Sequence, residues 1–408
     1  MISKDQHGFV NGRSCLSNLL KTLDDIIDSY DKGLIVDEIF MDFAKAFDKV
    51  PHQRLIFKLK KYGINGNLLC WIESFLSNRK QYVKIKDTLS GIRGVNSGVP
   101  QGSVLGPLLF LIFINDLPDN IVSETRLFAD DTKIFRVIES LADADILQDD
   151  INKLYDWCKK WKMFFNISKC HVIHFSKKNP QYFYHINGRL LESTSTEKDL
   201  GVVISKDLKP KEHIKEIVKK ANQTLGMLRR TFVHIDKDIF LLIYKSLVRP
   251  LLEYCHTAWS PYLAQDINLL ERVQRRATKM VVNMNTLPYE DRLKELKLFS
   301  LQHRRQRGDL ILVYKMYRGL VDMKIKDFFT EKKYLNNRGH SLKLELPKLP
   351  KTDIGHNAFS HRVIIPWNNL PETVINSESV QSFKRNYDKH VYKSHDLCPY
   401  ANNIEVDF

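Results

Sequence analysis

Several features that would indicate a secreted or membrane protein are missing from this sequence. Its cysteines form no C-x-x-C pair, and no nearby histidines have the spacing of a zinc site. We therefore expect reduced thiols in an intracellular protein. No uninterrupted apolar run reaches the roughly 20 residues of a membrane span, and the first residues do not resemble a signal peptide. The cysteines are Cys15, Cys70, Cys158, Cys170, Cys255 and Cys398.

The composition is that of a basic globular protein. The 408 residues are 43% hydrophobic, enough to bury a sizeable core, and the length suggests two or three domains. Lysine and arginine number 63 against 48 aspartates and glutamates, a net charge of +15. A surplus of this size favours a polyanionic partner, either nucleic acid or an anionic membrane surface, although a merely basic soluble protein would show it too.

Two adjacent acids, Asp130 and Asp131, lie between short runs that favour β-structure, residues 125–128 and 132–135. This pattern predicts a β-hairpin with the acidic pair at its tip. An acidic pair at a turn is most often present because aspartate hydrogen-bonds to its own backbone. A third carboxylate upstream and a glycine-rich turn between them favour a functional site instead.

The third carboxylate is Asp42. It follows the apolar run 34–41, which we expect to be a buried strand that brings the acid to the edge of a sheet. Asp48, a few residues later, fits a turn or cap residue better. The glycine-rich segment 98–107 then leads into an apolar helix over residues 108–117, and such a turn brings backbone close to a bound nucleotide base or sugar.

Three carboxylates suit phosphoryl transfer. Two divalent ions about 3.5–4 Å apart neutralise charge on the attacking and leaving oxygens when shared carboxylates hold them. Mg²⁺ prefers oxygen ligands, so Asp42, Asp130 and Asp131 can supply the set. A metal-dependent phosphohydrolase or cyclase would also use paired carboxylates, but it would not account for the glycine turn and the basic helices downstream.

Four segments of the chain resemble reverse transcriptases in their order and spacing, and more narrowly the polymerases of non-LTR (LINE-type) retrotransposons of the jockey-like group. Further stretches that resemble the family include Lys169, residues 198–202 and residues 270–277. The resemblance covers nearly the whole chain. The four segments are QHGF (6–9), MDFAKAFD (41–48), GVPQGSVLGP (98–107) and FADD (128–131).

The resemblance implies a role for each matching residue. Asp42, Asp130 and Asp131 would hold two Mg²⁺ ions, with Mn²⁺ as a substitute, and the backbone carbonyl of Phe43 would add a ligand. Lys169 matches the basic residue that approaches the pyrophosphate leaving group, although a solvent-facing lysine is an equal alternative.

The resemblance also places residues at the incoming nucleotide. Phe47 would be the aromatic gate that excludes a 2′-hydroxyl and favours deoxynucleotides; without the family, a core phenylalanine is as good an interpretation. Gln101 and Gly102 would line the nucleotide and the template base. The strand expected over residues 200–204 would steady the primer terminus.

Downstream, the chain becomes helical and basic. A helix expected over residues 211–230 has one apolar stripe, and its remaining surface is rich in lysine and arginine. In a polymerase this helix would belong to a thumb that grips template and primer phosphates, whereas a solvated lysine face is the ordinary alternative. Further helices are expected over 239–248, ending at Pro250, over 267–282, and over 301–320, which carries three more arginines. The candidate phosphate contacts are Lys211, Lys215, Lys219, Arg229 and Arg230.

We therefore predict an α+β right-hand polymerase with a small antiparallel sheet. The palm with incomplete fingers would span residues 1–204, a helical thumb 205–290, and a C-terminal region of unknown function 291–408. Family members carry a fingers region and an endonuclease before the QxGF segment, and neither is in this chain. We accordingly expect an N-terminally truncated product with intact catalytic carboxylates but weak or absent activity in isolation.

The predicted function is RNA-directed DNA polymerase in retrotransposition. The alternative is an inactive truncated relic that binds RNA or an RNA–DNA duplex. The expected partners are an RNA template, a DNA primer and deoxynucleoside triphosphates, with no membrane. The nucleus is the expected site of action, with the cytoplasm as the alternative.

Overall fold

The computed structural model describes residues 2–332 and 340–394, which fall into two compact units. The N-terminal unit comprises the residues up to Asn18 together with Gly33–Glu197. The C-terminal unit comprises Leu19–Lys32 and the described residues from Lys198 onward. Helix α1 (Cys15–Asp31) therefore contributes its first turn to one unit and its remainder to the other. Each unit is described by itself below.

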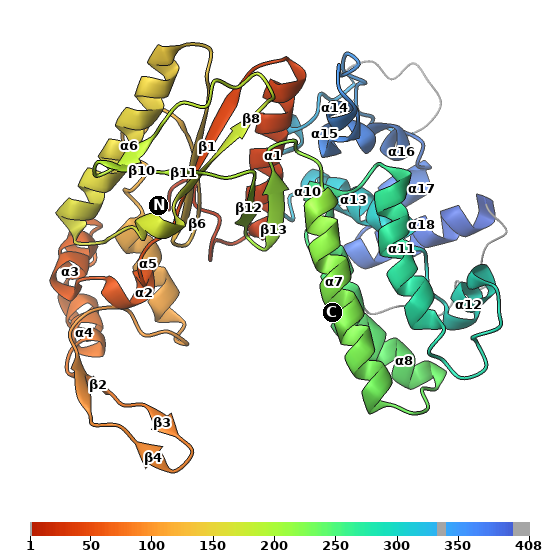
Figure 1. The fold of residues 1–408 in the computed structure, drawn as a ribbon, viewed down its shortest axis with the longest axis horizontal. Coiled ribbons are helices and arrows are strands. Elements are labelled where there is room, and N and C mark those ends of the chain that lie inside the picture. Colours follow the sequence, from red (N-terminus) through yellow and green to blue (C-terminus); the bar gives the residue numbers. More distant parts are fainter. Residues whose placement is uncertain (1, 333–339, 395–408) are drawn as a thin grey trace. The chain divides into compact units, whose positions relative to one another are not determined.

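A five-stranded sheet forms the centre of the N-terminal unit, in the order β11-β8-β1-β7-β6 (Figure 1). The central strand β1 (Val36–Met41) is buried along its whole length and pairs antiparallel with β7 (Asp131–Val137) and β8 (His171–Phe175). The edges are β6 (Glu124–Phe128), antiparallel to β7, and the short β11 (Glu192–Ser193), parallel to β8. With helices packed on it, this sheet confirms the α+β class.

Helices bury the apolar side chains of this sheet in one continuous core. The core joins residues of β1, β6 and β7, such as Ile39, Leu127 and Ile134, to the apolar faces of the surrounding helices. Helix α5 is apolar on nearly every side, as expected of a helix enclosed in a core. The helices are α2 (Ala46–Lys49), α3 (His52–Lys61), α4 (Gly66–Leu76), α5 (Leu105–Ile114) and α6 (Leu141–Trp161).

Between α4 and the glycine-rich segment, the chain extends into a long, exposed β-arm (Figure 1). The sequence analysis assigned no structure to this stretch. Its strands are β2 (Arg79–Gln81) paired with β5 (Arg93–Val95), and β3 (Lys84–Ile85) paired with β4 (Thr88–Leu89). The unit also contains the pair β9 (His185–Ile186) and β10 (Arg189–Leu190), and the 3₁₀ turn Ile167–Lys169.

A two-stranded sheet of β12 (Thr196–Asp199) and β13 (Val202–Ser205) precedes the helices of the C-terminal half of the chain. The expected strand over 200–204 is therefore wrong at its start. Leu200 and Gly201 both have positive φ, 45° and 86°, and form the two-residue turn between the strands. Consecutive residues with positive φ match the right-handed twist of a hairpin, so the strand begins only at Val202.

Helix α7 (Lys211–Thr231) follows this sheet and confirms the helix expected there. The next helix does not end at Pro250 as expected. A π-helical segment, Tyr244–Val248, follows α8 (Lys237–Ile243) and leads into α9 (Arg249–Glu253). Pro250 thus falls in the first turn of α9, where a missing N–H costs no helical hydrogen bond.

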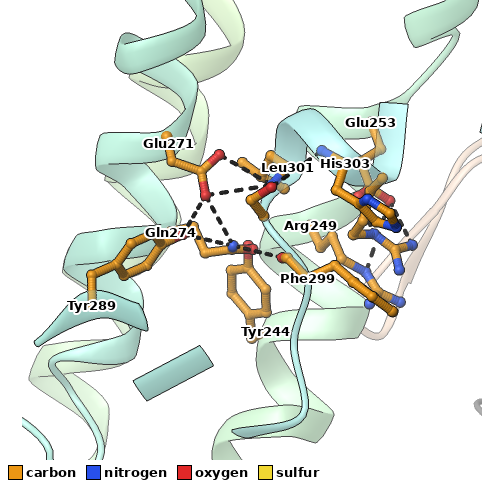
Figure 2. Close-up of polar contacts among 11 residues, drawn as sticks. Tyr244, Arg249, Glu253, Glu271, Gln274, Tyr289, Phe299, Leu301 and His303 are labelled. Carbon is orange, nitrogen blue, oxygen red and sulfur yellow. Dashed lines mark hydrogen bonds and ion pairs between the residues drawn. The ribbon is translucent and has the colours of Figure 1, made fainter. Parts of the chain in front are cut away.

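A buried polar network holds the following helices together (Figure 2). The Glu271 carboxylate, on α11 (Ala264–Thr278), accepts the Leu301 amide at 3.0 Å and the Tyr289 hydroxyl. Gln274 accepts the Tyr244 hydroxyl at 2.6 Å and donates to the Tyr289 hydroxyl at 2.8 Å. This network therefore joins α11 to the π-helical segment and to the starts of α12 (Tyr289–Leu296) and α13 (Leu301–Tyr317).

The arginines of α13 do not form the basic face that the sequence suggested. Arg304 pairs with Glu253 through two hydrogen bonds, and Arg307 pairs in the same way with Asp388 of α18 (Val380–Ser394). Arg305 is only 3% exposed. Arg304 and Arg307 therefore form ion pairs between helices of the C-terminal unit. Its shorter helices are α10 (His256–Trp259), α14 (Asp353–Asn357), α15 (Phe359–Arg362), α16 (Ile364–Asn368) and α17 (Glu372–Ile375), with a 3₁₀ turn at Ile325–Asp327.

Within the described residues, no helix has both the length and the apolar character needed to cross a membrane. In the part of the chain that the structure describes, the cysteines at positions 15, 70, 158, 170 and 255 form no disulfide. Cys398 lies outside the described residues.

Candidate active site

The predicted acidic hairpin is present in the N-terminal unit. Strands β6 and β7 pair up to Phe128 opposite Asp131, so that Ala129 and Asp130 alone form the turn. Ala129 has φ 56°, in the left-handed region that residues with a Cβ rarely occupy. The hairpin therefore confirms the expected placement of Asp130 and Asp131 at its tip, and it does so through a turn with an unfavourable backbone conformation.

Asp42 directly follows β1, as expected. In the antiparallel register Met41 lies opposite Thr132, and the continuation of that register brings Asp42 opposite Asp131. The carbonyl of Asp42 accepts the Asn166 amide at 2.7 Å, which fixes the chain where it leaves the strand. The end of the central strand and the tip of the hairpin therefore bring their acids to the same edge of the sheet.

The electrostatics of this edge reflect the proximity of the acids. Burial, and next the negative charge of Asp42, raise the pKa of Asp130 above its usual range. The Lys169 ammonium lies 3.4 Å from an oxygen of Asp42 and partly balances its charge, although both side chains remain substantially exposed. The fold thus keeps the carboxylates of Asp42 and Asp130 close together although their negative charges repel, which is common at sites that bind a cation.

The donor chemistry of the Asp42–Asp130 pair fits a hard divalent cation, because both side chains offer carboxylate oxygens. Across residues 2–332 and 340–394, however, no three histidine, cysteine, aspartate or glutamate side chains are gathered as ligands of one ion. Asp131 is the exposed first residue of β7. The structure thus brings Asp42 and Asp130 together, and the ligand role of Asp131 stays a prediction.

Phe47 lies beside the glycine-rich segment. Its half-buried ring stacks on Phe110 of α5 with centroids 4.2 Å apart and meets Phe9 edge to face at 6.4 Å. Its carbonyl accepts the Val99 amide at 2.8 Å. Gly98, at φ 84°, packs so closely that a Cβ there would lie 2.7 Å from the backbone of Asp48, so only glycine fits.

Gln101 and Gly102 are exposed in the same segment. Gly102 has φ 81°, and a Cβ built on it would meet no atom within 4 Å. The Gln101 amide donates to the Asp48 carboxylate at 3.0 Å. Asp48 lies in the first turn of α2, and this hydrogen bond to the predicted nucleotide segment was not expected from its position in the sequence.

The side chain of Phe43 lies in the core and takes no part in the site. Its ring is 4% exposed and packs on Phe165, with ring centroids 4.4 Å apart. The side chain is therefore part of the core. The predicted ligand is its backbone carbonyl, and that role stays a prediction.

The candidate phosphate contacts all belong to α7 in the C-terminal unit, where each is exposed. The opposite face of the helix is buried through residues such as Ile214 and Leu225, which confirms the predicted apolar stripe except at the partly exposed Val218. Lys215 donates to Glu212 at 2.7 Å, so part of its charge is balanced within the helix. Contacts of these residues with nucleic acid stay a prediction.

Gln6 is a residue that the sequence analysis quoted without assigning it a role. It is 2% exposed, and its side-chain amide binds the backbone of Ala129 at the hairpin tip. Its place in the QHGF segment was the only available signal. A hydrogen bond between a side chain and a backbone 123 residues away leaves no trace in local pattern.

Comparison with known proteins identifies the family. A family model described as "Reverse transcriptase (RNA-dependent DNA polymerase)" matches residues 1–217. The RNA-directed DNA polymerase from mobile element jockey of Drosophila funebris is 28% identical over 313 residues, which cover 72% of this chain and 33% of the relative. The probable RNA-directed DNA polymerase from transposon BS of Drosophila melanogaster is 28% identical over 301 residues, covering 68% of this chain and 32% of the relative. The chain thus spans about a third of the length of these curated relatives.

Among solved structures, apo telomerase from Candida tropicalis matches with a TM-score of 0.40 and 12% identity, covering 78% of this chain and 54% of the telomerase. Telomerase from Candida albicans in complex with a fragment of telomeric RNA matches with a TM-score of 0.36 and 12% identity, covering 67% and 53%. These likenesses are too distant to add to the assignment. The family model alone covers more than half of the 408 residues, and the chain therefore belongs to the reverse transcriptase (RNA-dependent DNA polymerase) family.

Proposed function

We propose that this chain catalyses template-directed addition of deoxynucleotides to a primer 3′-hydroxyl, with RNA as the natural template. The observation that carries the proposal is the convergence of Asp42 and Asp130 at one sheet edge, in a chain of the reverse transcriptase family. The substrates would be an RNA template, a DNA primer and deoxynucleoside triphosphates. The same family implies a divalent metal, which we take to be Mg²⁺, with Mn²⁺ able to replace it.

Asp42 and Asp130 would hold two metal ions, with Asp131 and the carbonyl of Phe43 completing the ligands. When bound, such ions neutralise negative charge on the attacking and leaving oxygens. Burial and the nearby charge of Asp42 raise the pKa of Asp130, and a bound cation would offset the cost of both, which supports this role. Lys169, already within 3.4 Å of Asp42, would contact the pyrophosphate leaving group.

The remaining site residues would orient the nucleotide. Phe47, held between Phe110 and Phe9, would present a rigid ring below the sugar and exclude a 2′-hydroxyl. Gln101 and the open backbone of Gly102 would contact the nucleotide and the template base. For Gln101 this requires an exchange of its hydrogen bond to Asp48 for one to the substrate.

The exposed basic residues of α7 would bind the phosphates of template and primer, in a thumb of residues 205–290 that follows a palm of residues 1–204. The region 291–408 has no proposed activity of its own. We infer the nucleus as the site of action, with the cytoplasm as the alternative. The complete retrotransposition activity would need segments beyond those matched here, since the chain spans about a third of its relatives.

Primer extension by the purified chain on poly(rA)/oligo(dT) with Mg²⁺ tests the proposal. The wild-type chain should extend the primer with dTTP, and Asp130→Ala should abolish extension while leaving duplex binding intact. Equal extension by both proteins would contradict the assignment of Asp130. No extension by either, together with salt-sensitive binding of the duplex by both, would instead identify an inactive relic that binds nucleic acid.

A further inference from the structure

The N-terminal residues 5–8 pair with the outer strand of the hairpin that carries Asp130. Gln6 forms a parallel bridge with Leu127 of β6, the last strand of the five-stranded sheet. The amide of Leu127 donates to the Asp5 carbonyl at 2.9 Å, and its carbonyl accepts the His7 amide at 2.8 Å. The edge of the hairpin that carries Asp130 is therefore paired by a segment from more than 100 residues earlier in the chain.

From this position the side chain of Gln6 reaches the turn itself. Its Oε1 accepts the Ala129 amide at 2.8 Å, and its Nε2 donates to the Ala129 carbonyl at 3.2 Å. The same Oε1 accepts the Gly8 amide at 2.8 Å, which orients the glutamine within its own loop. Gln6 thus binds both backbone polar groups of the residue that immediately precedes Asp130.

Ala129 is a residue that needs such support. Its φ of 56° lies in the left-handed region, where an L-residue with a Cβ is disfavoured by about 1 kcal/mol or more. Gly8 lies against it so closely that a Cβ on Gly8 would be 2.4 Å from the Ala129 nitrogen. Close packing and two directed hydrogen bonds therefore hold the strained turn in one conformation.

The loop that carries Gln6 is itself well anchored. The Arg13 guanidinium donates to the carbonyls of Ser3, Lys4 and Gln6 at 3.2, 2.8 and 2.6 Å. The His7 ring bonds the Ser17 hydroxyl at 2.8 Å. These hydrogen bonds fix the backbone that carries Gln6, as is required of a residue that positions another group.

We propose that Gln6 is a positioning residue of the active site, whose amide fixes the Ala129 turn and thereby the direction in which Asp130 presents its carboxylate. Gln6 touches neither substrate nor metal and acts only through the turn. The effect of Gln6 on catalysis rests on the proposed polymerase function. The stabilisation of the Ala129 turn by the Gln6 amide does not depend on that function.

The chain offers a matched control in Gln148 of α6. The Gln148 amide makes the same pair of bonds to one backbone residue, donating to the His185 carbonyl at 2.9 Å and accepting the His185 amide at 2.8 Å. It lies in the same unit but carries no acid of the site. Gln6→Met and Gln148→Met each remove a bidentate amide, keep the length of the side chain and release a different backbone residue. Gln6 is buried, whereas Gln148 is partly exposed and also donates to Asn152 at 3.1 Å, so the thermal midpoint of each variant is measured alongside.

Three measurements on the full chain test the proposal. In primer extension, Gln6→Met should lower kcat about tenfold or more with little change in duplex affinity, because misplacement of a catalytic group is costly. Mn²⁺ binding, followed by electron paramagnetic resonance, should weaken in Gln6→Met. Amide hydrogen exchange at Ala129 should accelerate about tenfold, since the amide loses its acceptor. Gln148→Met should leave all three at wild-type values.

Equal behaviour of the two variants in extension, Mn²⁺ binding and Ala129 exchange would overturn the inference. A wild-type chain that does not extend primers would refute the proposed function, whereas faster Ala129 exchange and weaker Mn²⁺ binding in Gln6→Met would still support the positioning role. If Gln6→Met does not fold, Gln6→Glu serves in its place. It keeps the size and both acceptor bonds, but a carboxylate oxygen would face the Ala129 carbonyl in place of the donor. It should therefore lower kcat and weaken Mn²⁺ binding, while the Ala129 amide, which keeps its acceptor, exchanges at about the wild-type rate.

Discussion

Two groups of acidic side chains in this protein have opposite surroundings. At the sheet edge of the N-terminal unit, burial and, in addition, the negative charge of Asp42 raise the pKa of Asp130. In the C-terminal unit, Glu271 is surrounded by donors from Tyr289, Gln274 and the Leu301 amide (Figure 2). There burial, together with the negative charge of Glu271, raises the pKa of the Tyr289 hydroxyl.

The difference distinguishes acids that are available to bind a ligand from an acid that stabilises the fold. A carboxylate whose oxygens are all hydrogen-bonded has little left to offer a ligand, and its loss removes several contacts at once. A carboxylate placed near another one destabilises the unit that holds it until a cation arrives. The comparison predicts that an acid of the sheet edge can be removed with a gain in stability and a loss of activity. The hydrogen-bonded Glu271 can be removed only with a loss of stability.

The largest effect should come from the acids of the sheet edge. Asp42→Asn or Asp130→Asn should reduce primer extension by about a thousandfold, on the order of 4 kcal/mol in the activation free energy. The thermal midpoint without metal should stay equal or rise, because a like-charge contact is removed. Differential scanning fluorimetry and extension assays measure the two quantities together.

Asp149→Asn is the control for those variants. Asp149 is an exposed acid of α6 that pairs with Lys153 at 2.8 Å, so its removal should change neither activity nor midpoint appreciably. A clear fall in the midpoint of Asp130→Asn would show that the comparison is wrong and that this acid contributes to the fold.

The next largest effect concerns the buried network. Glu271→Ala should lower the free energy of unfolding by about 3 kcal/mol, because the Tyr289 hydroxyl and the Leu301 amide would lose a charged acceptor in a buried setting. Urea denaturation of the full chain measures the change. Glu290→Ala, at an exposed position of α12, should cost less than about 0.5 kcal/mol, and equal losses in both variants would remove the distinction drawn here.

A third prediction extends the comparison to a buried base. His213 is 2% exposed, accepts the Val203 amide at 3.2 Å and packs on Trp259. Burial lowers the pKa of His213 from 6.5 to about 4, with Lys198 and Lys220 acting in the same direction and Glu216 opposing it. Because the unfolded chain binds the proton more readily, the folded state loses stability as the pH falls from 6.5 towards 4.

His213→Gln keeps an acceptor and removes the titration. Between pH 7 and pH 4.5 its loss of stability should be smaller than that of the wild type by about 2 kcal/mol. Urea denaturation at the two pH values gives the difference. Identical losses in the two proteins would mean that His213 does not carry this part of the acid sensitivity.

The smallest effect is expected on the surface of α7. If Lys219 contacts a phosphate, Lys219→Gln should reduce the slope of log affinity against log salt by about 0.9, at a cost below about 1 kcal/mol in duplex binding. Lys215→Gln should change the slope less, because Lys215 already pairs with Glu212 at 2.7 Å. Fluorescence anisotropy over a salt series measures both, and unchanged slopes would favour a merely solvated face.

Local patterns were enough to predict much of the secondary structure. The apolar run before Asp42, the β-favouring residues on both sides of Asp130 and the apolar stripe of α7 each depend on neighbours within one turn or one strand. The turn at Leu200 and Gly201 and the passage of the helix through Pro250 were missed. Both depend on backbone conformations that the surrounding packing selects and that residue type only permits.

The sequence by itself determined which chemistry is available, namely three aspartates, a glycine-rich segment and a surplus of basic residues, together with most of the elements that carry them. Only the tertiary structure decided which groups meet. It brought Asp42 to Asp130, turned the arginines of α13 into internal ion pairs, and placed the amide of Gln6 on the turn at Ala129. The reason is physical: short-range periodicity fixes local conformation, whereas a contact between residues far apart in the sequence depends on how whole elements pack.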